Sequence, residues 1–272
     1  MAQRLRATMP GMSRSHLVRL PATALCVGLG LVFAWWAITA MGQPDVAAYD
    51  LAAASVRAGE PLYVPGSMNA ADVYRYTPWF AALWSLVGSR LLLLIASLAA
   101  VAYVAWRTRD AWPVNVLLIG CLLGSVSDGN VQPLLVASLV WSRDRWTGAA
   151  WVAIAASIKG VPGAFALVYL GRRQWARFAL FTVIAAVAFL PMLAFDLSAY
   201  PTESGSRTIL WNTPLYVPVV AAGAVITLLA ARTRHGWLAA AALAVIAMPR
   251  FWLYDLSWLL VPLARDDEAM AD

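Results

Sequence analysis

Long apolar runs separated by short arginine clusters constrain the fold of this sequence more than any other feature. The first run, residues 20–41, is long enough to cross a bilayer, which requires about 20 consecutive apolar residues. Further runs lie at 91–106, 111–126, 131–142, 147–170, 174–195, 214–231, 236–248 and 251–264. Of the 272 residues, 62% are hydrophobic and 12% are charged, too few polar residues to cover a soluble domain of this size. The pattern excludes a soluble globule and predicts an all-α polytopic membrane protein.

We interpret residues 20–41 as a retained anchor, because the apolar region of a cleaved signal peptide spans only about 7–15 residues. Residues 1–19 then form a cytoplasmic tail, and 42–77 and 196–213 form extracytoplasmic loops of a single integral membrane domain, 1–272. Val46–Ala58 predicts an amphipathic helix on the outer membrane surface. Several later runs are shorter than a bilayer requires, and short helices are tolerated beside a water-filled cavity. We therefore expect a reaction or binding chamber among about eight spanning helices.

The distribution of arginine tests this threading, because Lys and Arg concentrate on the cytoplasmic side of membrane proteins. With the N-terminus inside, 13 arginines lie in segments predicted to be cytoplasmic: Arg4, Arg6, Arg14, Arg19, Arg107, Arg109, Arg143, Arg145, Arg172, Arg173, Arg177, Arg232 and Arg234. The predicted outer segments hold 4: Arg57, Arg75, Arg90 and Arg207. The net charge of +6 is therefore interpreted as membrane topology and not as a nucleic-acid-binding surface.

The same threading requires the run at 147–170 to enter and leave on one side. Arg143 and Arg145 precede this run, and Arg172 and Arg173 follow it. We predict a re-entrant hairpin that turns at residues 159–163, where glycine and proline break the helix. The alternative is one continuous spanning helix with the double arginine outside.

Lys159 is the sole lysine among 20 basic residues and lies in the middle of an apolar run. A charge at that depth costs at least about 2.5–3.5 kcal/mol, which makes it a candidate functional residue. It suits an anion such as a lipid phosphate, although a structural pair with a buried Asp explains it as well. Arg250 suits the same anion, or a solvated turn after Pro249.

The acidic candidates each have two interpretations. Asp255 is either a structural ion-pair partner or a catalytic group, and Asp128-Gly129-Asn130 is either an exposed turn or a polar entry into the chamber. Asp45 and Asp50 begin the outer loop, where a charge costs nothing, so their expected burial does not distinguish them. The sequence contains no metal-binding motif, phosphate-binding loop, dinucleotide fingerprint or nucleophile elbow, and it predicts neither a metal nor a cofactor.

Several stretches, taken in order, form a recognisable pattern. Asp45 and Tyr49 open the Ala-rich stretch, which Gly59 and Leu62-Tyr63 follow. The remaining elements are Tyr76-Thr77-Pro78, Gly129-Asn130-Val131-Gln132 with Leu134-Leu135, Ile158-Lys159-Gly160-Val161-Pro162, Arg172-Arg173 with Trp175, and Pro249 through Tyr254-Asp255-Leu256. In order and spacing the chain resembles, from about Asp45 to Pro262, the polyprenyl-phosphate-sugar-dependent glycosyltransferases of family 87. These are membrane enzymes with the C-type glycosyltransferase fold.

The resemblance implies a metal-independent, inverting transfer of a sugar, usually mannose, from a polyprenyl-phosphate donor. The acceptor would be a lipid- or polymer-linked glycan on the extracytoplasmic face of the plasma (inner) membrane. It implies Asp45 as the general base, with Asp50 as the fallback, and Lys159 and Arg250 on the donor phosphate. The remaining residues implied for the cavity or the sugar are Tyr49, Tyr76, Asn130, Gln132, Tyr254 and Asp255.

Two features depart from the family pattern, and two other functions compete with transfer. Family members usually run considerably longer, and Asp50 replaces what is often an aromatic residue. A flippase or transporter of polyprenyl-linked sugars would also use short helices, a cavity and a buried cation, but transporters tend to contain paired repeats, and none is seen here. The short length also suits a catalytically inactive paralogue that acts as an assembly subunit.

Overall fold

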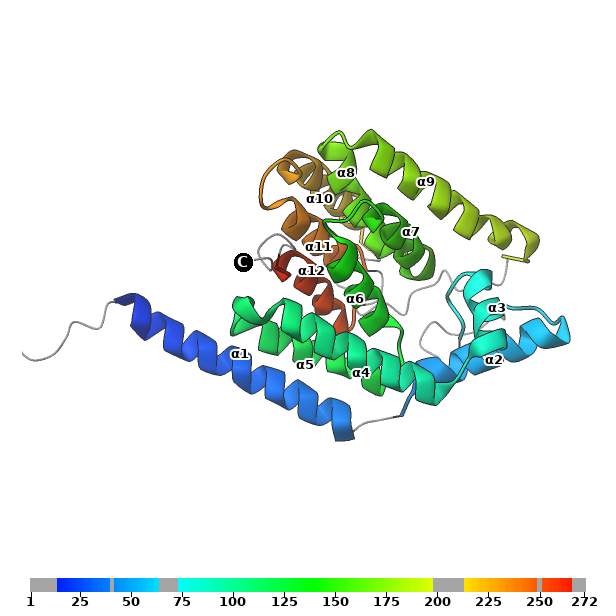
Figure 1. Ribbon diagram of the computed structural model, residues 1–272, viewed down its shortest axis with the longest axis horizontal. Coiled ribbons are helices and arrows are strands. Elements are labelled where there is room, and N and C mark those ends of the chain that lie inside the picture. The colour runs from blue at the N-terminus through cyan, green and yellow to red at the C-terminus, as the bar shows by residue number, and fades with distance from the viewer. Residues whose placement is uncertain (1–13, 40–41, 64–72, 198–212, 249–250, 266–272) are drawn as a thin grey trace, which may run out of the picture.

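The computed structural model describes residues 14–39, 42–63, 73–197, 213–248 and 251–265 (Figure 1). Side chains are not described for residues 14–20, the first seven of α1. Within these ranges the chain is all-helical and contains no strand. The α-helices are α1 (Arg14–Thr39), α2 (Pro44–Ala58), α3 (Pro78–Val87), α4 (Arg90–Arg107), α5 (Val114–Ser127), α6 (Gln132–Ser142), α7 (Gly148–Lys159), α8 (Ala166–Gly171), α9 (Trp175–Phe189), α10 (Tyr216–Ala230), α11 (Gly236–Ile246) and α12 (Leu260–Leu263). Short 3-10 helices are η1 (Arg109–Ala111), η2 (Val161–Phe165), η3 (Leu190–Ala194) and η4 (Leu253–Leu259).

The predicted all-helical class is confirmed, and the lengths of the helices differ from one another widely. In the described ranges, 3 helices are long and apolar enough to cross a membrane: Pro21–Thr39, Arg90–Arg107 and Trp175–Ala194. The other apolar helices have 10–17 residues. Figure 1 shows α1 and α9 at opposite edges of the bundle, with α2 and α3 together at one end. The expected total of about eight spanning helices stays a prediction.

Large apolar side chains cover the outside of the bundle. The exposed fraction is 82% for Leu86, 78% for Leu193 and 75% for Leu229. None of the Trp175–Ala194 helix is buried within the protein, although it is among the most apolar segments. Exposed apolar surface of this extent in water would drive association, so these faces favour a lipid environment.

The predicted hairpin at 147–170 is confirmed as a reversal of the chain. Helix α7 ends at Lys159, and Gly160 follows with φ of 73°, a conformation that side chains rarely adopt. The chain returns through η2 and α8, and a Cβ at Gly148 would lie 3.0 Å from the hydroxyl of Tyr169. The two arms of the hairpin therefore meet, and the continuous-helix alternative is wrong.

The last apolar run does not form the single helix that the sequence suggested. Residues Leu253–Leu259 form a 3-10 helix, and only the four residues Leu260–Leu263 are α-helical. The Asp255 carboxylate accepts the backbone N–H of Trp252 at 2.8 Å and so caps the start of η4. The capped segment places Tyr254 and Asp255 at the end of the bundle that holds α2.

Arginine side chains bind helix ends at the opposite end of the bundle. Arg143 donates to the carbonyl of Ala264 at 2.9 Å, and Arg107 donates to that of Arg265 at 2.5 Å. Arg265 also pairs with Asp110, and this hydrogen bond lowers the pKa of the Asp110 carboxyl below its usual value. These bonds satisfy carbonyl groups that helix ends leave without partners. The arginines predicted to be cytoplasmic thus gather at one end wherever the structure describes their side chains.

Helices α1 and α5 cross closely at two glycines. A Cβ at Gly120 would lie 2.3 Å from the carbonyl oxygen of Gly30, and a Cβ at Gly30 would lie 2.6 Å from the carbonyl oxygen of Val116. Small residues at such crossings let helix backbones approach one another in membranes.

We expect Gly120→Ala to separate α1 from α5 and to destabilise the protein by about 1–3 kcal/mol, as overpacking does in other closely packed interiors. The measurement is the thermal unfolding midpoint of the purified protein in detergent. Gly28→Ala is the matched control in α1, because a Cβ at Gly28 meets no heavy atom within 4 Å. Equal unfolding midpoints for the two variants would contradict the close crossing.

Candidate functional site

The start of α2 is bound to the loop that joins α5 to α6. The backbone N–H of Gln43 donates to the carbonyl of Ser127, and that of Asp45 donates to the carbonyl of Asp128, both at 3.0 Å. Pro44 begins the helix, a position where its fixed φ and missing N–H carry no penalty. Asp45 therefore sits in the first turn of α2, directly against this loop.

Gly129 makes the close contact between loop and helix possible. Its φ is 67°, in the left-handed region that glycine adopts readily. A Cβ at this position would lie 2.3 Å from Cγ2 of Val46 in α2. Gly129 thus allows the loop to pack against α2, and the next residue, Asn130, contacts Asp45.

Asn130 connects Asp45 to the start of α6. Its Nδ2 donates to Oδ2 of Asp45 at 2.5 Å, and its Oδ1 accepts the backbone N–H of Gln132 at 2.8 Å. The amide is therefore oriented from both sides. An N–H donor aimed at the carboxylate stabilises its charged, proton-accepting form.

Tyr76 contacts the same nitrogen of Asn130 as Asp45 does, and it belongs to a tyrosine network. Its hydroxyl accepts from Nδ2 of Asn130 at 3.4 Å and from the hydroxyl of Tyr49 at 3.2 Å. Its backbone carbonyl accepts from the hydroxyl of Tyr63 at 3.0 Å. The Asp45, Tyr49, Leu62-Tyr63 and Tyr76 motifs of the sequence thus form one connected unit.

Lys159 reaches the same region from the tip of the hairpin. Its Nζ lies 4.8 Å from the centre of the Tyr254 ring, a cation–π contact. The carboxylates of Asp255, Asp45 and Asp128 all act on it electrostatically. Near the same end of α7, Ser157 accepts a hydrogen bond from the indole of Trp79 at 3.2 Å, which ties the hairpin to α3.

We call Asp45, Tyr76, Asn130, Lys159 and Tyr254 the Asp45 cluster. Asp45, Tyr76, Lys159 and Tyr254 are partly exposed, and Asn130 is buried behind Asp45. The cluster draws on α2, the segment before α3, the loop after α5, the tip of the hairpin and η4. A carboxylate, a cation and aromatic rings thus lie together in this cluster.

Three other predicted residues support the cluster from behind and do not line it. Tyr49, Gln132 and Asp255 have 0% exposure. Tyr49 contacts Tyr76, and Gln132 donates to Oγ of Ser257 at 3.2 Å, which joins α6 to η4. Their side chains expose no surface to a ligand in this structure, and their assignment to the cavity or the sugar stays a prediction.

Asp255 nevertheless remains electrostatically important. Its Oδ2 caps η4, whereas its buried Oδ1 has no hydrogen-bond partner among the described residues. An uncompensated buried carboxylate is costly, and the nearby ammonium of Lys159 offsets part of that cost. This arrangement supports the structural interpretation of Lys159 as well as the functional one, and the two are not exclusive.

Asp50 lies apart from the cluster, on a different face of α2. Its carboxylate accepts from Arg90 at 2.7 Å and from the indole of Trp84 at 2.9 Å. These partners hold Asp50 in a surface ion pair outside the Asp45 cluster. Arg250, predicted to bind the donor phosphate, lies outside the described residues.

Asp128 is the residue that sequence reasoning undervalued. It is partly exposed at the end of α5, binds α2 through its backbone and acts electrostatically on Lys159. The available signal was the polar triplet Asp128-Gly129-Asn130 between two apolar runs.

Among the residues that the structure describes, no group of three or more His, Cys, Asp or Glu could hold a metal ion.

Comparison with known proteins finds no matching family model, no matching curated protein and no matching solved structure.

Proposed function

We propose that the protein transfers a sugar, with mannose the expected one, from a polyprenyl-phosphate donor to an acceptor hydroxyl at the Asp45 cluster. One observation carries the proposal: the Asn130 amide orients the Asp45 carboxylate within a partly exposed cluster that also contains Lys159. A base and a cation in one cluster are what transfer from a phosphate leaving group requires. The resemblance to family 87 supplies the substrate class.

The proposed reaction is a single displacement at the anomeric carbon. The oxygen of the acceptor hydroxyl forms a bond to this carbon while the bond from the carbon to the phosphate oxygen breaks. The hydroxyl proton passes to Asp45, and the electron pair of the broken bond leaves with polyprenyl phosphate. The configuration at the anomeric carbon is therefore inverted.

The other residues of the cluster have complementary roles. Lys159 stabilises the negative charge that develops on the leaving phosphate, since an oriented cation in a site of low polarity is effective there. The partly exposed rings of Tyr76 and Tyr254 offer surfaces for a sugar and the start of a prenyl chain. Asn130 holds Asp45 in the orientation that accepts the proton.

The proposal places the arginine-rich end of the bundle in the cytoplasm and the Asp45 cluster on the outer face of the plasma membrane. The helix ends bound by Arg107, Arg143 and Arg265 mark the first end, and α2 and α3 mark the second. Positive side chains are retained on the cytoplasmic side during insertion. The acceptor, a lipid- or polymer-linked glycan, would then be met outside the cell.

Cysteine labelling is expected to reveal this orientation. In a Cys26→Ser, Cys121→Ser background, Glu60→Cys after α2 should react with an impermeant maleimide added to intact cells. Thr147→Cys between α6 and α7 should react only after the cells are opened, and both positions are exposed in the structure. Labelling of Thr147→Cys in intact cells, with Glu60→Cys protected, would show that the orientation in the membrane is the reverse of the proposed one.

Transfer itself is tested in membranes supplied with radiolabelled polyprenyl-phosphate mannose. The proposal predicts that label moves into a glycan product only when the protein is present. Label that crosses the bilayer while still attached to the prenyl carrier would instead indicate a flippase. Absence of both results, with the protein folded and the acceptor supplied, would favour an assembly subunit.

A further inference from the structure

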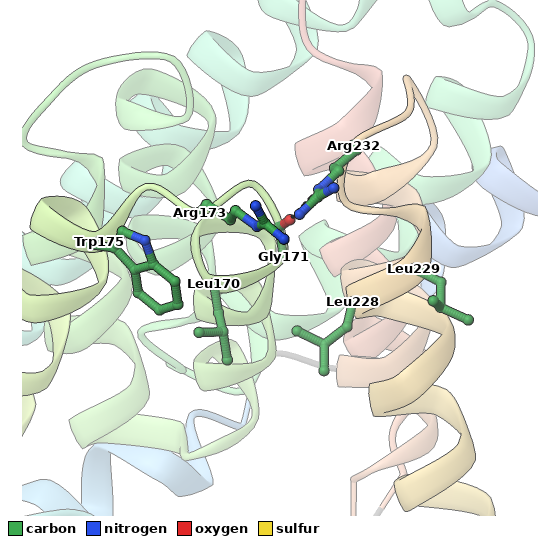
Figure 2. Close-up of a pocket in the computed structure, with 7 residues that line it drawn as sticks. All are labelled: Leu170, Gly171, Arg173, Trp175, Leu228, Leu229 and Arg232. Carbon is green, nitrogen blue, oxygen red and sulfur yellow. Dashed lines mark hydrogen bonds between the residues drawn. The ribbon is translucent and has the colours of Figure 1, made fainter.

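A pocket of about 630 Å³ lies at the arginine-rich end of the bundle, opposite the end that holds the Asp45 cluster. It forms between the end of α8, the start of α9 and the last turn of α10 (Figure 2). Arg173 and Arg232 lie on one side of it, and Leu170, Leu228 and Trp175 lie below and beside them.

Two hydrogen bonds fix the position of the pocket's polar side. Nε of Arg172 donates to the carbonyl of Ala231 at 2.7 Å, and Nε of Arg232 donates to the carbonyl of Gly171 at 2.9 Å. The two bonds run in opposite directions between the ends of α8 and α10. They hold Arg232 in place while using only one of its nitrogens.

Among the residues that the structure describes, no carboxylate neutralises the positive charge in this pocket. Figure 2 shows the guanidinium groups of Arg173 and Arg232 converging near the Gly171 carbonyl. Arg173 makes no hydrogen bond or ion pair with any residue that the structure describes, and no carboxylate lines the pocket. The nearby Asp144 is paired with Arg143 at 3.0 Å. Two cations so placed favour a bound anion with several acceptor oxygens.

The rest of the pocket is apolar and opens to the outside of the bundle. Trp175 is 61% exposed and Leu229 is 75% exposed. Trp175 is in the first turn of α9, and Leu229 is in the last turn of α10. Arg173 precedes the start of α9, and Arg232 follows the end of α10. This is the arrangement expected at a membrane surface, with cations at headgroup level and apolar groups beside the acyl chains.

We propose that this pocket binds the phosphate of an anionic membrane phospholipid. Arg173 and Arg232 hold the phosphate oxygens, while Leu170, Leu228 and Trp175 contact the upper part of the acyl chains. The site is separate from sugar transfer and does not depend on that function. Arg173 and Arg232 favour an anionic headgroup over a zwitterionic one, because they would repel the ammonium group of a zwitterionic lipid.

The test measures lipid binding to the purified full-length protein in detergent by native mass spectrometry. Phosphatidylglycerol and phosphatidylcholine with identical acyl chains are compared for the wild type, Arg173→Gln and Arg234→Gln. Arg234 is the matched control, because it lies at the same end of the bundle but outside the pocket. Thermal unfolding without added lipid shows whether each variant is folded.

We expect phosphatidylglycerol to bind more tightly than phosphatidylcholine, and Arg173→Gln to weaken that preference by about five-fold while Arg234→Gln retains it. Equal binding of the two lipids, or equal losses in the two variants, would overturn the proposal. Competition by inorganic phosphate at concentrations equal to the lipid would overturn the lipid assignment in favour of a site for free phosphate. Tighter binding of polyprenyl phosphate than of phosphatidylglycerol would overturn the phospholipid assignment in favour of a carrier-lipid site.

Discussion

Replacing Asp45 with asparagine is expected to reduce the rate of sugar transfer by about 10²–10⁴-fold, the usual contribution of a general base. Asparagine keeps the size of the side chain but cannot accept the proton of the acceptor hydroxyl. The oxygen of the introduced amide can still accept the hydrogen bond from Nδ2 of Asn130, so the folded yield should stay close to that of the wild type. The measurement is the turnover of labelled donor, normalised to the amount of folded protein.

Asp50→Asn is the matched control in the same helix. Asp50 is paired with Arg90, and both side chains are substantially exposed, with 42% exposure for Asp50 and 58% for Arg90. Exposed pairs contribute little to stability, so we expect turnover near that of the wild type. A near-normal rate for Asp45→Asn with a collapse for Asp50→Asn would transfer the role to Asp50. Normal rates for both would remove this helix from the mechanism.

Replacing Lys159 with methionine is expected to weaken apparent donor affinity by at least about 30-fold. The bound donor would bury the charge pair between Lys159 and the phosphate, and truncating one partner of such a pair costs about 2–5 kcal/mol. Methionine keeps the apolar stem, so the folded yield should hold in spite of the lost contact with Tyr254. The measurement is the donor concentration that gives half-maximal transfer, at saturating acceptor.

Arg145→Met provides the control for Lys159→Met. Arg145 also makes a cation–π contact, 4.6 Å from the centre of the Trp141 ring, but at the arginine-rich end. Its replacement should leave donor affinity unchanged. Loss of folded protein in Lys159→Met, with unchanged affinity in the fraction that folds, would mean that Lys159 serves only to neutralise buried Asp255.

The general form of the fold is predictable from the sequence because the bilayer imposes simple rules. Apolar runs and arginine clusters indicate where helices begin and end, and the glycines and proline at 160–163 indicate the reversal of the hairpin. The last run is the exception. It is also apolar, yet it forms a 3-10 helix capped by Asp255, followed by the short α12. These features depend on local hydrogen bonds, which hydropathy does not predict.

The membership of the candidate site is predictable in part. The sequence motifs indicate Asp45, Tyr76, Asn130, Lys159 and Tyr254 separately. These residues lie together because each is at or beside a helix end on the same side of the bundle. Burial was not predictable: Tyr49 and Gln132 are polar residues in apolar surroundings, and only the packed structure shows them fully enclosed. The ion pair that occupies Asp50 joins residues 40 positions apart, which no local pattern reveals.

The most direct test of the central claim is the anomeric configuration of the product formed by the purified protein. The protein, reconstituted in vesicles with polyprenyl-phosphate mannose and a short glycan acceptor, is expected to yield a glycoside whose anomeric configuration, determined by NMR, is opposite to that of the donor. A product that retains the configuration of the donor, or no product from folded protein, would contradict a single displacement assisted by Asp45.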